Sequence, residues 1–237
     1  MATIYSPNIV TSGLKFCIDA ANVRSYSGTG TSVTDISGNG YGATLVNGVT
    51  LGSENRGRFV LDGTDDYINT TFSADIITTG FTINCAFYNT YSPADIRFLA
   101  SMHVSSDANT VFRIELNQTQ VGSLEFGHCY AGTAIAAQDE LISNNFANNT
   151  WHNVALVWNP SGTTKYIYKN GVLDTSVSVS SRPMQFYSGA TLRIGGRHDS
   201  NIRPMSGYIP FFYVYNRALS ATEIEQNFNA TRDRFGV

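Results

Sequence analysis

The chain has 237 residues and a formal net charge of −3, and only 14% of its residues are charged, against roughly 25% in an average protein. It has no run of lysine and arginine interleaved with aromatic residues and no apolar stretch long enough to span a bilayer, which argues against nucleic-acid partners and membrane insertion. The three cysteines are odd in number and far apart, so no disulfide framework is expected, and no linker or repeat divides the chain.

The elements predicted in chain order are short β-strands separated by turn residues. Residues 1–13 carry no strand or helix pattern and are assigned to an amino-terminal arm, and residues 14–237 to one domain. Residues 14–19 alternate apolar and polar side chains, as a half-buried strand does, and residues 20–43 are expected to form a long glycine-rich loop. The further predicted strands are residues 58–62, 67–71, 81–88, 96–103, 110–116, 124–130, 151–158, 165–169, 172–177, 191–195 and 208–215.

Residues 151–158 are predicted to form a central strand, because their sequence, WHNVALVW, places large apolar groups on both faces. Asn170 and Gly171 follow the next predicted strand and favour a hairpin, since a type I′ turn needs positive φ at both central residues. Many short strands with regularly spaced turns favour an all-β fold, a two-sheet antiparallel sandwich.

One helix near the end of the chain completes this prediction. Ser220 and Glu223 have the spacing of a capping box, in which each side chain accepts a hydrogen bond from the other residue's backbone N–H. Ile224 and Phe228, four residues apart, form the apolar stripe of the helix. We expect this helix to lie across one edge of the sandwich.

Several stretches of the chain resemble the laminin G-like branch of the concanavalin A-like lectin/glucanase jelly rolls, in the same order and from about residue 14 to residue 228. The resemblance implies a jelly-roll sandwich, but it implies little about activity, because one fold hosts many functions. The stretches that carry it are LDGTDDY (61–67), WHNVALVW (151–158), YIYKNG (166–171), LRIGGR (192–197) and YNRALS (215–220).

No pair of catalytic carboxylates is evident along any one predicted strand. Glycosidases of this fold need two carboxylates flanking the scissile bond, which on a strand means acids at alternating positions. Glu115 has only Arg113 as a polar neighbour on its own face, and Glu125 has no acid two positions away. We therefore predict that the protein is not an enzyme and that these acids are solvated.

The densest acidic turn, at Asp62, Asp65 and Asp66, is the candidate metal site. Calcium takes several carboxylate and carbonyl oxygens as ligands, and many modules that this chain resembles hold one calcium near such a loop. Pro210 lies where that family pattern often has an acid, which weakens the match. One structural calcium and a metal-free Asx-type turn both stay open, and no other cofactor is expected.

A glycan-binding surface needs exposed aromatic rings beside hydrogen-bonding groups on one sheet face. Tyr88, Arg113, His128 and Tyr130 are the candidate residues for such a patch. The alternative is that they are ordinary residues of the core and its rim.

The resemblance extends to jelly rolls of tailed-phage structural and adhesive proteins, whose endings are similar to NRALS (216–220) and NATR (229–232). The amino terminus lacks the features of a signal peptide, and virion proteins leave the host cytoplasm by lysis. We therefore favour a non-catalytic virion protein, namely a capsid decoration, head-fibre or tail-fibre module that mediates adhesion or subunit packing and is a candidate for glycan binding. A free carbohydrate-binding module is the alternative, and a glycosidase-like enzyme is less favoured.

The expected partners are identical subunits and other virion proteins, with cell-surface glycan as a further candidate. The residues before Leu14 have no structural pattern of their own, so we expect a partner chain to hold them through apolar anchors such as Ile4, Tyr5 or Ile9. Identical copies are favoured as that partner, because closed symmetry dominates soluble assemblies.

Overall fold

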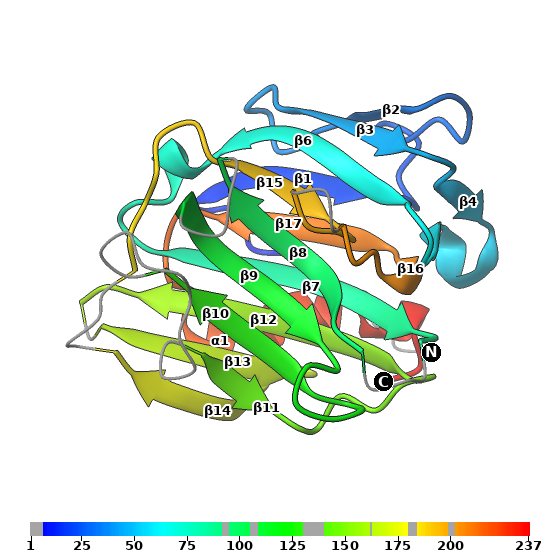
Figure 1. The fold of residues 1–237 in the computed structure, drawn as a ribbon. Helices are drawn as coiled ribbons and strands as arrows, with labels where there is room; N and C mark the ends of the chain where they lie inside the picture. Colours follow the sequence, from blue (N-terminus) through cyan, green and yellow to red (C-terminus); the bar gives the residue numbers. More distant parts are fainter. Residues whose placement is uncertain are drawn as a thin grey trace, which may run out of the picture.

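The structure is a computed structural model that describes residues 7–91, 95–104, 109–129, 140–161, 163–179, 184–198 and 202–237. Two antiparallel sheets, which we call sheet A and sheet B, lie one behind the other (Figure 1). The α-helix of the described residues, α1 (Ala221–Thr231), packs on the outer face of sheet A. The prediction of a two-sheet antiparallel sandwich with a short C-terminal helix is confirmed.

Within the described residues, sheet A contains nine antiparallel strands. In order they are β14 (Val172–Ser178), β13 (Thr164–Lys169), β12 (Trp151–Asn159), β7 (Phe81–Asn89), β16 (Ser206–Ile209), β5 (Arg58–Asp62) and β4 (Thr50–Gly52), with β17 (Phe211–Tyr215) also paired to β7 and β1 (Leu14–Asp19) paired to β17. The central strand is β7, because β12 pairs with it on one side while β16 and β17 share its other side.

Sheet B, as far as the structure describes it, contains eight antiparallel strands and lies in front of sheet A in Figure 1. In order they are β11 (Leu141–Ser143), β10 (Leu124–His128), β9 (Thr110–Leu116), β8 (Arg97–His103), β15 (Thr191–Ile194), β6 (Tyr67–Ser73), β3 (Gly42–Val46) and β2 (Ser32–Thr34). Short 3₁₀ helices occupy Glu54–Arg56, Ala74–Ile76 and Arg232–Arg234.

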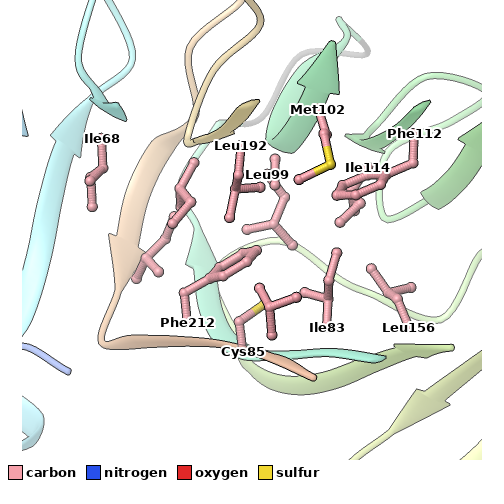
Figure 2. Packing of buried hydrophobic residues seen from close by; sticks show 14 of the residues in the cluster. Ile68, Ile83, Cys85, Leu99, Met102, Phe112, Ile114, Leu156, Leu192 and Phe212 are labelled. Atoms are coloured by element: carbon pink, nitrogen blue, oxygen red, sulfur yellow. The ribbon is translucent and has the colours of Figure 1, made fainter. Parts of the chain in front are cut away.

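The main hydrophobic core fills the space between the two sheets. Figure 2 shows Leu99 and Ile114 of sheet B pointing toward Ile83 and Leu156 of sheet A. Strand β12 is covered on both faces, as predicted: Leu156 faces this core, and its neighbour Ala155 belongs to a second apolar cluster under helix α1.

The two most local predictions are also confirmed. Asn170 and Gly171 have φ angles of 50° and 81° and join β13 to β14, as a type I′ hairpin requires. Ser220 Oγ accepts a hydrogen bond from the Glu223 backbone N–H, and the Glu223 carboxylate accepts one from the Ser220 backbone N–H, which completes the capping box.

The prediction differs from the structure where strands are short or interrupted. Strand β2 lies inside the loop expected at residues 20–43, and its three residues are too few to show a period of two. The strand expected at 208–215 is divided into β16 and β17 at Pro210, because proline has no N–H to donate to a ladder.

Residues 8–12, assigned to an amino-terminal arm, lie against the end of the same chain. Val10 is buried and its backbone N–H donates to Asn227 Oδ1 at 2.8 Å, while its carbonyl accepts from the Tyr215 hydroxyl at 2.9 Å. Ile9 packs against the apolar cluster under helix α1. These contacts are made within one chain, whereas we expected a partner chain to hold this segment; Ile4 and Tyr5 lie outside the described residues.

Candidate functional site

Four side chains form a line across the outer face of sheet A. Trp151, Tyr88, Tyr208 and Arg58 lie on four neighbouring strands, β12, β7, β16 and β5, and we call them the aromatic row. Tyr88 lies directly opposite Trp151 on one side and Tyr208 on the other, so the strand register alone brings the rings together. With about 4.8 Å between strands, the row is roughly 14 Å long.

The members of the aromatic row are in contact along its whole length. The Tyr88 ring centroid lies 5.3 Å from that of Trp151 and 5.4 Å from that of Tyr208. The Arg58 guanidinium carbon lies 3.6 Å from the Tyr208 centroid, a cation–π contact, and Glu54 pairs with this arginine at 3.1 Å. All four residues are half-buried, so each keeps part of its surface in contact with solvent.

Gly207 allows strand β16 to approach β7 closely enough to form the row. Its φ is 141°, and a Cβ at this position would lie 1.9 Å from the Tyr88 carbonyl oxygen. Only glycine fits there, because any side chain would separate the two strands that carry Tyr88 and Tyr208.

The residues predicted to form one ligand patch do not share a face. Tyr88 belongs to the aromatic row on sheet A, whereas Arg113 projects from β9 on the outer face of sheet B. His128 is fully buried, and its ring stacks on Trp158 at 6.3 Å between centroids. Tyr130 lies outside the described residues. The alternation of side chains along a strand does not reveal which sheet that strand joins.

Arg113 instead belongs to a buried cluster of charges on β9, β10 and the residue before β11. Its Nη2 donates to Glu140 Oε1 at 2.7 Å, and its Nε lies 3.3 Å from Glu115 Oε1. Glu115 lies directly opposite Glu125 on the neighbouring strand. One carboxylate oxygen from each of the three glutamates lies within 4.8 Å of the others. We call Glu115, Glu125 and Glu140 the glutamate cluster.

Burial changes the acidity of this cluster. It raises the pKa of Glu115 to about 7, although Arg113 beside it acts in the opposite direction. The pKa of Glu125 is also raised, by burial first and then by the Glu140 carboxylate. Glu115 and Glu125 are only 2% and 0% exposed, so our expectation of solvated acids is wrong.

The glutamate cluster was missed because only same-strand neighbours were considered. Glu115 and Glu125 lie at equal distances from Gln120 in the sequence, so a symmetrical hairpin between residues 110–116 and 124–130 would have placed them opposite each other. Glu140 could not have been added, because it reaches the cluster from a different segment.

Two of the four histidines, which show no metal-ligand spacing in the sequence, meet on sheet B. The backbone N–H of His198 donates to His103 Nε2 at 2.8 Å, and the two rings are 4.6 Å apart at their centroids. Burial, together with Arg193 and His103, lowers the pKa of His198 to about 3. His198 is therefore neutral at physiological pH.

The acidic turn after β5 brings Asp62, Asp65 and Asp66 together, with one carboxylate oxygen from each within 4.8 Å of the others. Asp66 Oδ2 accepts a hydrogen bond from the Asp62 backbone N–H at 3.0 Å, and Asp62 Oδ1 accepts one from Thr64 N–H at 2.7 Å. Within the described residues, the buried Asp66 Oδ1 accepts none. The turn thus combines an Asx-type hydrogen bond with a free oxygen that fits a calcium ligand.

A hollow of about 580 Å³ opens beside helix α1, and its lining includes Asp19, Arg56 and Arg234. Arg234 Nη1 donates to both carboxylate oxygens of Asp19, at 3.0 and 2.9 Å, and its Nη2 donates to the Gly57 carbonyl at 3.1 Å. The charges of Asp19 and Arg234 are thus engaged with each other, and we assign no ligand to the hollow.

The fold is similar to several solved structures of botulinum neurotoxin domains. The receptor-binding domain of the C/D mosaic serotype superposes with a TM-score of 0.71 at 13% identity, covering 92% of this chain and 51% of that one. The serotype D ligand-binding domain, solved with N-acetylneuraminic acid, gives 0.71 at 15% identity, with the same shares of 92% and 51%. The type G receptor-binding domain gives 0.67 at 14%, again with 92% and 51% covered. The chain thus spans about half of each domain, and the likeness concerns the fold.

The remaining comparisons define the family. Among proteins of curated function, none matches the sequence. In the part of the chain that the structure describes, no helix has the length and apolar character needed to cross a membrane. The family model Laminin_G_3, described as concanavalin A-like lectin/glucanases superfamily, matches residues 62–225, which is more than half of the chain. Sequence and fold agree, and the chain belongs to this laminin G-like family of the concanavalin A-like lectin/glucanases superfamily.

Proposed function

We propose that this protein is a non-catalytic, lectin-like module that binds carbohydrate through the aromatic row. The observation that carries the proposal is the unbroken line of Trp151, Tyr88, Tyr208 and Arg58 across four strands, with every member half-buried. Aromatic rings offer apolar faces to sugar rings, while the tyrosine hydroxyls and the guanidinium offer hydrogen bonds.

The burial of the glutamate cluster supports a function without catalysis. A glycosidase needs two carboxyl groups that flank the scissile bond and reach the substrate. Glu115 and Glu125 are 2% and 0% exposed, so a sugar cannot approach their carboxyl groups in this conformation.

A glycan array followed by calorimetric titration of the best-bound glycan tests this proposal. Tyr88→Ser and Tyr208→Ser should each weaken binding roughly tenfold or more, a loss of about 1.4 kcal/mol. Tyr166→Ser is the matched control, because Tyr166 is a half-buried tyrosine of β13, on the same sheet but outside the aromatic row. Failure to bind any glycan, or equal weakening by all three substitutions, would contradict the proposal.

We also propose that the turn of Asp62, Asp65 and Asp66 holds one structural calcium. The free, buried Asp66 Oδ1 supports this, because an unpaired carboxylate oxygen is costly to bury. Desolvation raises the pKa of Asp66, and a bound cation would stabilise its ionised form. The ion would fasten the end of β5 to the start of β6.

For the biological setting, we propose a capsid decoration, head-fibre or tail-fibre module on a tailed-phage virion, partnered by identical subunits and other virion proteins. The resemblance of residues 216–220 and 229–232 to phage jelly rolls and the low charge density support this setting. Mass spectrometry of purified particles from the source should detect the protein, and light scattering should show an oligomer. A strictly monomeric protein that is absent from particles would contradict the setting without affecting the carbohydrate proposal.

A further inference from the structure

The three carboxylates of the glutamate cluster are fixed in position by groups around them. Glu125 Oε1 accepts hydrogen bonds from the Thr119 backbone N–H at 3.0 Å and from the Ser123 hydroxyl at 3.3 Å. Arg113 pairs with one oxygen each of Glu115 and Glu140. These contacts engage only one oxygen of each carboxylate.

The other oxygens of the two strand glutamates have no such contact. Within the described part of the chain, Glu115 Oε2 and Glu125 Oε2 are buried and accept no hydrogen bond. A buried carboxylate oxygen without a hydrogen-bond donor or cation is strongly unfavourable. Two such atoms in one cluster therefore point to a missing ligand that carries positive charge.

The charge balance of the cluster agrees with a divalent cation. If all three carboxylates are ionised, as ligands of a metal ion are, the neighbouring Arg113 guanidinium leaves an excess of two negative charges. Arg197 also acts on Glu115, more weakly than Arg113 does. A buried charge without a counter-charge is energetically costly. A bound divalent cation would balance the negative charge of the glutamate cluster.

The number of carboxylate ligands favours calcium over magnesium. Calcium–oxygen distances are about 2.3–2.6 Å, so two ligands of one calcium ion can lie up to roughly 5 Å apart. Magnesium binds oxygen at about 2.0–2.1 Å, which limits this separation to roughly 4.2 Å. The ligand oxygens of the cluster lie within 4.8 Å of one another, close enough to share one ion. Three carboxylates in one site favour calcium, because magnesium usually keeps several water ligands and takes only one or two carboxylates.

We propose that Glu115, Glu125 and Glu140 form a calcium site, separate from the Asp62–Asp65–Asp66 turn. The ion would join β9 and β10 to the residue that precedes β11, and so fasten the end of sheet B. The site is independent of the aromatic row, which lies on sheet A.

The test uses the full chain with Asp65→Asn, which removes a ligand from the aspartate turn and leaves the glutamate cluster intact. After dialysis against EDTA, CaCl₂ at 100 times its dissociation constant should raise the melting temperature by about 5–10 °C. Adding Glu125→Gln, which keeps an oxygen to accept from Thr119 N–H, should abolish this rise. Calorimetric titration should show one calcium fewer per chain in the double variant, and MgCl₂ should bind more weakly than CaCl₂.

Two results would overturn the proposal. The first is a calcium-induced rise in melting temperature that is equal in Asp65→Asn and in the double variant with Glu125→Gln. The second is a wild-type protein that binds a single calcium ion and loses it on the substitution Asp65→Asn. If Glu125→Gln prevents folding, as judged by circular dichroism, Glu140→Gln in the same background decides the matter, since this glutamate lies outside the strands. The exposed Glu225→Gln on helix α1 is the control for loss of one negative charge.

Discussion

Gly171 lies against the ring of Phe228, so that a Cβ at position 171 would come within 2.9 Å of Phe228 Cδ1. The turn of the β13–β14 hairpin is thereby docked on helix α1. Gly171→Ala should lower the free energy of unfolding by about 1–3 kcal/mol, because it adds both a clash and an unfavourable φ of 81°. Urea denaturation measures this loss.

The control for Gly171→Ala is Gly30→Ala. Gly30 has a similar φ of 76°, but a Cβ there would have no atom within 4 Å. The control should therefore report the backbone strain alone and cost less. Equal losses for the two substitutions would show that docking against Phe228 adds nothing.

The cap of helix α1 should contribute measurably to stability. Ser220→Ala removes the hydroxyl that accepts from Glu223 N–H and should cost about 1 kcal/mol. For a chain of this size, such a loss corresponds to a melting temperature lower by about 2–4 °C. Thr222→Ala removes a hydroxyl from the same helical turn without removing the cap, and differential scanning calorimetry should find it close to the wild type.

The pair formed by Arg217 and Glu223 should make stability depend on pH. Hydrogen bonds from Arg217, at 2.8 and 2.6 Å, lower the pKa of Glu223 to about 2 from its ordinary 4.5. Because the folded pKa is the lower one, this contribution is fully present above pH 4.5 and is lost as the pH falls toward 2. The difference in unfolding free energy between the wild type and Glu223→Gln should shrink over that interval; a constant difference would contradict this assignment.

The thiols of Cys17 and Cys85 should be unreactive in the native protein. Burial raises the pKa of Cys17 to about 12, with Asp19 and Asp35 adding to the effect, and burial alone raises that of Cys85 still further. Since the thiolate is the reactive form, a thiol reagent at pH 8 should modify neither residue until the protein is unfolded in urea. Rapid labelling of the native protein, located by peptide mass spectrometry, would show that the strands carrying them open.

The proposed calcium at the aspartate turn predicts a response to chelation. EDTA should lower the melting temperature of the wild type, and Asp66→Asn should reduce that response, because Asp66 supplies the free buried oxygen. A melting temperature unchanged by EDTA would argue against a structural calcium at either acidic cluster.

Sequence reasoning succeeded where the information is local. The Asn170-Gly171 turn and the Ser220–Glu223 capping box depend on residues within four positions, and both occur as predicted. The aromatic row and the glutamate cluster depend instead on strand order and register. Of the row, only Tyr88 was identified in advance, because its neighbours Trp151 and Tyr208 come from distant parts of the chain.

The pairing of β1 with β17 has a consequence for biosynthesis. These strands lie near the two ends of the described chain, and Leu14 is opposite Tyr215. During translation β1 therefore cannot pair with β17 until residues 211–215 have left the ribosome, and β7 likewise lacks β16 and β17 until then. Pairing over such sequence separations folds slowly and leaves strand edges exposed. We therefore expect sheet A to stay incomplete, with exposed strand edges, until β16 and β17 have been synthesised.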